Sequence, residues 1–139
     1  MRPADPVRKV ETMGKQENTE YVRYIAECIE AVNEGRAYRD DDGNIVIVDI
    51  DEEMPEDVEA LTMYDYFDDV FDIVHYVGGR DDYRGVRLMV ACGGPNVYVD
   101  SMRRTVELYW WSESATWDLS YSASEDITDT FREYFECCY

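Results

Sequence analysis

From Phe71 to Tyr121, apolar and polar residues alternate in short runs that are separated by turn-forming segments. The runs are FDIVHYV, VRLMVAC, NVYVD, TVELYWW and TWDLSY, and the separating segments include GGRDDYRG and GGP. A period of two residues is typical of a strand with one buried face, and short polar connections join antiparallel neighbours. This half of the chain is therefore predicted to form an antiparallel meander of about five strands.

The alternation divides the predicted sheet into two faces. The apolar face consists of Val86, Leu88, Val90, Val97, Val99, Val106, Leu108, Trp110, Trp117 and Leu119. The other face carries Arg87, Tyr98, Glu107, Tyr109, Trp111 and Asp118, a set that suits partial exposure to solvent. Tyr98, Tyr109 and Trp111 are candidates for an aromatic interface, or else they belong to an ordinary half-buried surface beneath the N-terminal helix.

Two longer helices are predicted on either side of this region in the sequence. The first is capped by Asn18 or Thr19 and ends near Asn33, with apolar residues at helical spacing. The second begins at a capping box, Ser122 to Glu125, and its apolar stripe is expected to cover the sheet.

The segment between the first helix and the sheet is predicted to contain only short elements. Asp42-Gly43-Asn44 is a turn signal before a short strand over 45–48, Pro55 is a candidate start of a short helix, and a short acidic helix covers 62–70. The predicted fold is α+β, with a flexible arm over 1–16 and a single domain over 17–139.

Charge is distributed unevenly along the 139 residues, whose net charge is −19. Residues 1–39 hold 7 acidic and 7 basic residues, whereas residues 40–72 hold 14 acidic residues and no Lys or Arg. This acidic block comprises Asp40, Asp41, Asp42, Asp49, Asp51, Glu52, Glu53, Glu56, Asp57, Glu59, Asp65, Asp68, Asp69 and Asp72. Because 14% of the residues are aromatic, a folded surface and not a disordered tail is expected to carry the charge.

A surface of this sign disfavours direct binding to nucleic acid or to anionic membranes. Duplex DNA carries one charge per about 1.7 Å, so fourteen carboxylates match the charge of roughly seven base pairs, or about 24 Å of duplex. The acidic block is therefore a candidate DNA mimic for a basic nucleic-acid-binding protein. A second acidic surface is predicted on the C-terminal helix at Asp126, Asp129, Glu133 and Glu136. The alternative is that the acids serve only solubility.

No catalytic, metal or cofactor motif is identified. In DDDGN, Gly43 at position 6 of an EF-hand loop would place Tyr38 at the first ligand position, so a turn is the better interpretation. The lone His75 lies between apolar residues and is interpreted as structural. The N-terminus lacks the apolar region of a secretory signal, and the cysteines lack metal-binding spacing, so we expect reduced thiols in the cytoplasm. The cysteines are Cys28, Cys92, Cys137 and Cys138.

Two stretches, CGGPNVYVD at 92–100 and VELYWW at 106–111, resemble the core of a family of short acidic proteins. These proteins are encoded on phages, plasmids and conjugative elements of anaerobic gut bacteria, and the resemblance extends over about residues 65–138. It implies a mobile-element setting in a bacterial host cell and no catalytic residues. Acidic proteins of such elements are similar in size and charge to anti-CRISPR and anti-restriction inhibitors, several of which mimic DNA.

These observations predict a non-enzymatic inhibitor whose acidic block occupies the DNA-binding groove of a restriction nuclease or CRISPR effector. The alternative function is a protein-interaction module or homodimer that uses the aromatic sheet face. In that case the acids would contribute only solubility.

Overall fold

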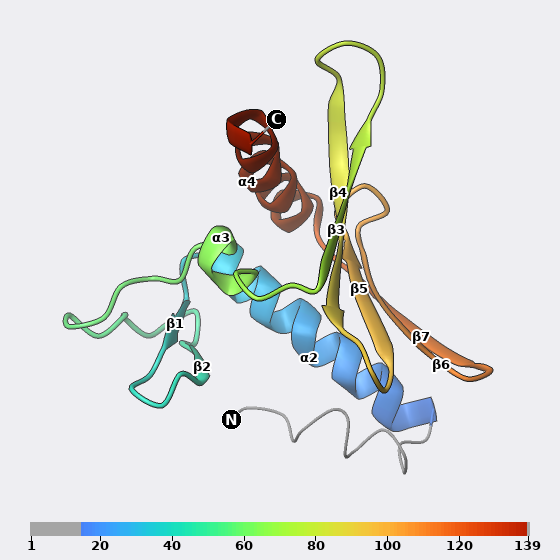
Figure 1. The fold of residues 1–139 in the computed structure, drawn as a ribbon. Coiled ribbons are helices and arrows are strands. Elements are labelled where there is room, and N and C mark those ends of the chain that lie inside the picture. The colour runs from blue at the N-terminus through green and yellow to red at the C-terminus, as the bar shows by residue number, and fades with distance from the viewer. Residues whose placement is uncertain (1–14, 139) are drawn as a thin grey trace.

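The computed structural model describes residues 15–138 and has a mixed α+β fold, as predicted (Figure 1). The main sheet is antiparallel with the order β3-β4-β5-β6-β7, so each strand pairs with its neighbour in the sequence. The bounds are β3 Asp72–Val77, β4 Tyr83–Ala91, β5 Asn96–Asp100, β6 Thr105–Trp110 and β7 Glu113–Asp118. The predicted five-strand meander is thus confirmed.

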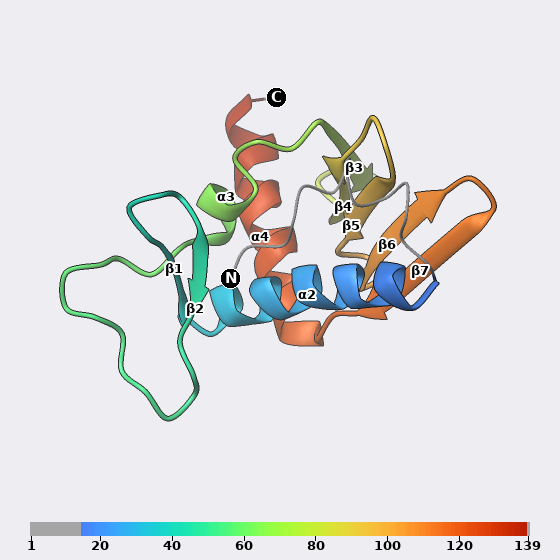
Figure 2. The same ribbon diagram turned by 90° about the horizontal axis from the view of Figure 1, so that it is seen from below.

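Two helices, α2 (Lys15–Asn33) and α4 (Tyr121–Cys138), pack on the same side of this sheet (Figures 1 and 2). Helix α2 lies along β6 and β7, and α4 lies against β4. Between them and the sheet lie aliphatic side chains that are completely buried, namely Val22, Ile29, Val86, Leu88, Val97, Val99, Val106, Leu108 and Ile127. Full burial of one such side chain stabilises the fold by about 1.5–3 kcal/mol. Within residues 15–138, neither helix combines the length and apolar character that a membrane crossing requires.

The start of α2 differs from the prediction. The helix already includes Lys15, so the proposed caps Asn18 and Thr19 lie inside it, and Asn18 is only 1% exposed. Residues 1–14 of the predicted arm lie outside the described residues, and residues 15 and 16 are helical. The predicted end at Asn33 is correct, and Gly35 follows with a φ of +72°, a conformation that favours glycine.

A small lobe connects α2 to the sheet. It contains a hairpin of β1 (Ala37–Arg39) and β2 (Ile45–Ile47), of which only β2 was predicted. Gly43 has a φ of +84° and closes the hairpin, which confirms the predicted turn. The strand β1 has three residues, too few to show a period.

The short helix before the sheet, α3, covers Met63–Tyr66 and is shorter than the predicted 62–70. Thr62 caps it, because its hydroxyl accepts a hydrogen bond from the backbone N–H of Asp65 at 3.1 Å. No helix begins at Pro55, so that prediction is wrong. A helix from Pro55 would place Glu56 and Glu59 at an i,i+3 spacing, where like charges repel each other.

The N-terminus of α4 is capped by Ser120, not by the predicted Ser122. The hydroxyl oxygen of Ser120 accepts a hydrogen bond from the backbone N–H of Ala123 at 3.0 Å. Glu30 of α2 accepts hydrogen bonds from both the N–H and the hydroxyl of Ser120, each at 2.6 Å. These hydrogen bonds connect the last turn of α2 to the start of α4.

We therefore expect Ser120→Ala to lower the free energy of unfolding by about 1–2 kcal/mol, because it removes a helix cap. Ser122→Ala is the matched control and should change it by less than about 0.5 kcal/mol. Urea denaturation of both variants measures the difference. In the structure the hydroxyl of Ser122 accepts only an exposed hydrogen bond from Nδ2 of Asn33 at 3.0 Å, so a loss for Ser122→Ala as large as that for Ser120→Ala would contradict the assignment of the cap to Ser120.

The far end of α4 packs on the β3–β4 hairpin through aromatic rings. His75 of β3 lies 4.8 Å from Phe135 between ring centroids, and its Nδ1 is 2.7 Å from the hydroxyl of Tyr83. Burial lowers the pKa of His75, which means that the fold favours the neutral ring. Its interpretation as a structural histidine is consistent with this environment.

The stability of the protein should therefore depend on pH below the ordinary His pKa of 6.5. The folded pKa is lower than the unfolded one, so the unfolded chain binds the proton first. The free energy of unfolding should be fully retained above pH 6.5 and should fall as the pH drops from 6.5 through the folded pKa. In His75→Phe this slope should flatten, and an unchanged slope between pH 5 and 7 would contradict the assignment.

Candidate functional site

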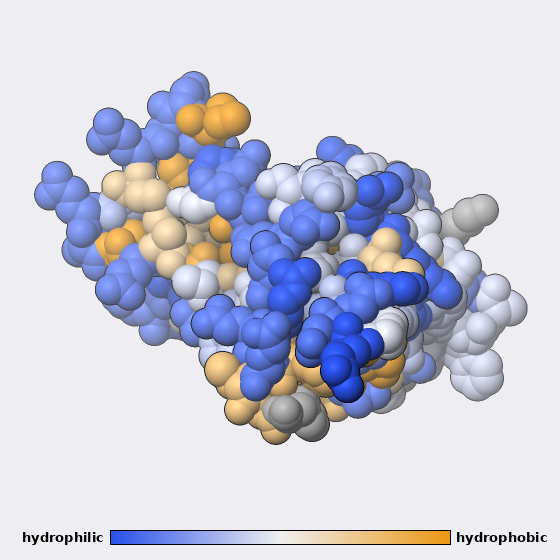
Figure 3. Space-filling view, turned by 90° about the horizontal axis from the view of Figure 1, so that it is seen from above, coloured by the Kyte–Doolittle hydropathy of each residue, from blue (hydrophilic) through white to orange (hydrophobic). Residues whose placement is uncertain are grey.

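The acidic block lies in the lobe that projects from the helix–sheet body (Figures 1 and 3). It occupies the turn of the β1–β2 hairpin, the acidic loop (residues 48–62), α3 and the connection to β3. Figure 3 shows this lobe at the left as mainly hydrophilic, with small hydrophobic patches. One exposed apolar residue of the loop is Ile50, which is 82% exposed.

Exposure is nearly uniform within the acidic block. Thirteen of its fourteen carboxylates are on exposed residues, and only Asp40 is partly buried. The Oδ1 atom of Asp40 accepts hydrogen bonds from the backbone N–H groups of Asp42 at 3.0 Å and of Asn44 at 2.9 Å. Asp40 therefore closes the hairpin turn, and the other thirteen are available to a partner.

Ion pairs do not neutralise this surface within residues 15–138. Pairs form elsewhere, between Arg23 and Glu27, Arg36 and Glu34, Arg84 and Asp82, Arg132 and Asp129, and at Arg87. Arg39 is the one cation on the hairpin strands, and it donates to the carbonyl oxygen of Gly43 at 3.0 Å. The summed field of the lobe is consequently negative.

The two ends of the acidic loop are hydrogen-bonded to two consecutive residues, Arg36 and Ala37. The N–H of Val48 donates to the carbonyl of Arg36, and the N–H of Leu61 donates to that of Ala37, each at 2.8 Å. Such a loop, with its ends held close together, resembles an Ω-loop. It displays Asp49, Asp51, Glu52, Glu53, Glu56, Asp57 and Glu59 without using any of them in the core.

Two of the four acidic residues predicted on α4 line a groove beside the acidic loop, and the other two do not. Asp126 and Glu133 line a groove whose other wall is formed by residues 60–64, so they adjoin the acidic loop. Burial, together with the neighbouring Asp129, raises the pKa of Asp126. Asp129 is paired with Arg132 at 2.7 Å, and Glu136 is exposed outside the groove lining. The second acidic surface is thus only partly continuous with the first.

Tyr98 and Tyr109 lie on the sheet face that α2 and α4 leave uncovered, so the alternative that places this face beneath the N-terminal helix is wrong. Tyr98 and Tyr109 are neighbours, with ring centroids 6.2 Å apart. Trp111 is 87% exposed in the β6–β7 turn, with a φ of +55°. Tyr109 is 41% exposed, and its hydroxyl donates to Glu107 at 2.7 Å.

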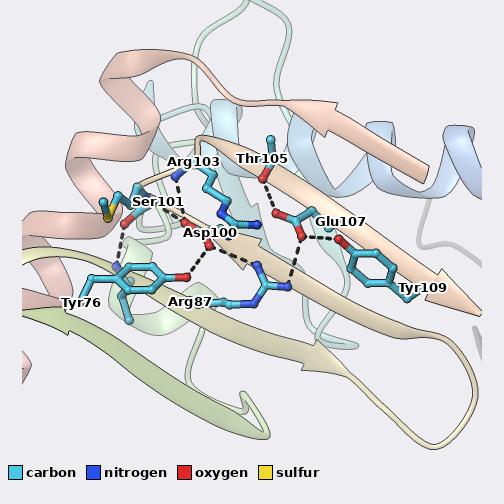
Figure 4. A network of polar contacts seen from close by, with 10 residues as sticks. Tyr76, Arg87, Asp100, Ser101, Arg103, Thr105, Glu107 and Tyr109 are labelled. Atoms are coloured by element: carbon cyan, nitrogen blue, oxygen red, sulfur yellow. Dashed lines mark hydrogen bonds and ion pairs between the residues drawn. The ribbon is translucent and has the colours of Figure 1, made fainter. Parts of the chain in front are cut away.

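The same face contains a buried charge network that the sequence did not indicate (Figure 4). Arg87 lies between Asp100 and Glu107 and donates to one oxygen of each at 3.1 Å. Asp100 is 0% and Glu107 is 3% exposed, so the expected partial exposure is wrong for Glu107, whereas the side chain of Arg87 is partly exposed, at 21%. The guanidinium carbon of Arg87 also lies 4.2 Å from the ring centroid of Tyr98.

Further hydrogen bonds satisfy both carboxylates. Asp100 accepts from the hydroxyl of Tyr76 at 2.7 Å and from the backbone N–H groups of residues 102 and 103 at 3.1 and 2.9 Å. Burial tends to raise the pKa of Glu107, but hydrogen bonds from Thr105, Tyr109 and Arg87 outweigh it and leave the pKa below its ordinary value. We interpret the network as structural, because each charge is committed to a partner.

Other places that could hold a ligand offer little chemistry. A pocket behind the hairpin is lined by Tyr21, Tyr24, Cys28 and Tyr66, and burial raises the pKa of the Cys28 thiol and of the Tyr66 hydroxyl. Within the described chain, all four cysteines are free and no three His, Cys, Asp or Glu side chains cluster as metal ligands would.

Comparison with protein-family models, with curated proteins and with solved structures gave no match. The assignment of function therefore depends on the surface itself.

Replacing Arg87 should destabilise the fold, because its partners Asp100 and Glu107 would remain buried without a counter-charge. Arg87→Met is expected to lower the free energy of unfolding by about 3 kcal/mol, since it leaves two carboxylates buried and uncompensated. Arg84→Met breaks an exposed pair with Asp82 and should cost at most about 0.5 kcal/mol. Denaturation at pH 7 measures both, and equal losses would mean that the network contributes no more than a surface pair.

Proposed function

We propose that the protein is a non-enzymatic inhibitor that mimics the charge of DNA and occupies the nucleic-acid groove of a basic protein. The observation that carries this proposal is the exposure of thirteen carboxylates of the acidic block with no Lys or Arg paired to them within residues 15–138. Elsewhere in residues 15–138, six of the sixteen acids form ion pairs with arginines. The absence of Lys and Arg from residues 40–72 is the feature that a solubility role does not explain.

The charge of the lobe suits a groove that normally holds a polyanion. Its fourteen carboxylates correspond to roughly seven base pairs of duplex by charge. A cationic groove would attract this surface at long range and release its bound anions on contact. The resemblance of residues 65–138 to mobile-element proteins directs the proposal to a host defence enzyme, either a restriction nuclease or a CRISPR effector.

Neutralising the acidic loop tests this function. A variant with Asp51, Glu52, Glu53, Glu56 and Asp57 changed to Asn and Gln should bind the target about 100-fold more weakly at low salt, at roughly 0.5–1 kcal/mol for each charge. A control variant makes the same change at exposed acids elsewhere, namely Glu20, Asp81, Glu113, Asp118 and Glu125. It should lose no more than about threefold, because distant charges are screened.

Binding should also weaken steeply as salt rises, and duplex DNA should compete with the protein regardless of base sequence. Affinity measurements from 50 to 300 mM NaCl, with and without competitor DNA, provide this readout. A flat salt dependence, or equal losses in the two five-site variants, would refute the electrostatic mechanism.

The second candidate function is a protein interaction or homodimer through the uncovered sheet face. The observation that favours it is the 87% exposure of Trp111 beside Tyr109, since large exposed aromatics often anchor interfaces. Trp111→Ala and the mass of the protein in solution separate the two functions. Loss of binding or assembly in Trp111→Ala, with binding retained after neutralisation of the loop, would favour this candidate.

A further inference from the structure

A groove runs between α4 and the segment from residue 60 to residue 64, with the end of α2 at its base. On the α4 side, Asp126, Thr130 and Glu133 follow one another at helical spacing along its wall. We refer to this feature as the α3–α4 groove. It shares residues 60–62 with the acidic loop, but none of the loop's carboxylates lines it.

The lining of the α3–α4 groove is more apolar than polar. Leu61 and Tyr134 are partly buried in its lining, and Met63 beneath them is 2% exposed. Tyr64 is 55% exposed, and its ring centroid lies 6.5 Å from that of Tyr134. The lining therefore offers aromatic and aliphatic surface that is incompletely covered by the protein itself.

The charges at the groove all have one sign. Asp126 and Glu133 are among the lining residues, and no Lys or Arg is. Glu59 and Asp65, both exposed, flank the opposite wall in the sequence. An occupant must therefore combine apolar groups with positive charge, because an acidic occupant, including a second copy of this chain, would be repelled.

We propose that the α3–α4 groove binds a short amphipathic helix of a partner protein, with aliphatic residues on one side and Lys or Arg at the margins. An amphipathic helix presents anchors at i, i+3 or i+4 and i+7 to an apolar groove. An extended peptide that binds by strand addition would need a strand edge, and none of the groove-lining residues belongs to a strand. The proposal rests on the proposed function only in that the partner is basic, because no residue of the acidic block lines the groove.

The probe for this site is a synthetic helical peptide with Leu at i, i+4 and i+7 and Lys at the outward positions. A scrambled peptide of the same composition is its control. Fluorescence anisotropy with the full chain under reducing conditions should show at least about tenfold tighter binding of the amphipathic peptide. Equal binding of the two peptides would mean that charge suffices, and it would overturn the proposal.

Matched variants locate the binding. Glu133 lines the groove and Glu125, on the same helix, does not. Glu133→Lys and Glu125→Lys therefore change the net charge equally, but only the first changes the groove. Likewise, Thr130→Trp fills the groove, whereas Thr116→Trp adds the same side chain on exposed β7. The groove variants should weaken the amphipathic peptide at least about tenfold and the controls less than about twofold. Equal effects within either pair would overturn the proposal.

This measurement uses no nucleic-acid-binding target, so it fails or succeeds independently of the DNA-mimic test. If the peptide does not bind while DNA competition holds, the groove proposal is wrong and the proposed function stands. If the peptide binds while neutralisation of the acidic loop leaves the affinity for the target unchanged, the groove proposal stands and the proposed function is wrong. Circular dichroism of each variant confirms that the fold is retained.

Discussion

The apolar contact between one face of the sheet and the helices α2 and α4 is the interaction on which the remaining structure depends. Val97, Val99, Val106 and Leu108 are completely buried there, together with Val22, Ile29 and Ile127 of the helices. Both helices pack on the same face, so within residues 15–138 no helix covers the other face. The buried charged groups of the uncovered face must therefore pair with one another. Arg87 lies between Asp100 and Glu107, beside the ring of Tyr98, and donates a hydrogen bond to each carboxylate.

The acidic loop can carry its charge because its carboxylates lie outside the core, although Ala37, Met63 and Phe67 of the surrounding lobe belong to that core. Backbone hydrogen bonds from Val48 to Arg36 and from Leu61 to Ala37 hold the two ends of the loop. None of its seven carboxylates is removed from water, so none carries a desolvation cost. Mutual repulsion among them is moderated by solvent and salt. The lobe can therefore hold a concentration of negative charge that a packed element would not tolerate.

The two proposed surfaces would contribute different things to recognition. The acidic block acts at long range, where charge accelerates association and is largely insensitive to the exact shape of the partner. The α3–α4 groove acts at contact distance, where apolar complementarity selects a particular segment. Their proximity at residues 59–64 would allow one basic partner to engage both.

The sequence by itself determined the five-strand meander, the hairpin turn at Gly43 and the end of α2, because period-two alternation and turn residues act locally. It also located the acidic block. The bounds of β5, Asn96–Asp100, match the predicted run NVYVD. Only the tertiary structure decided that Ser120 caps α4, since its partner Glu30 lies 90 positions away in the chain. Strand register placed Arg87 opposite Asp100, and the packing of α3 on α4 created the groove. These features depend on distances between residues that are remote in sequence, and local periodicity carries no information about such distances.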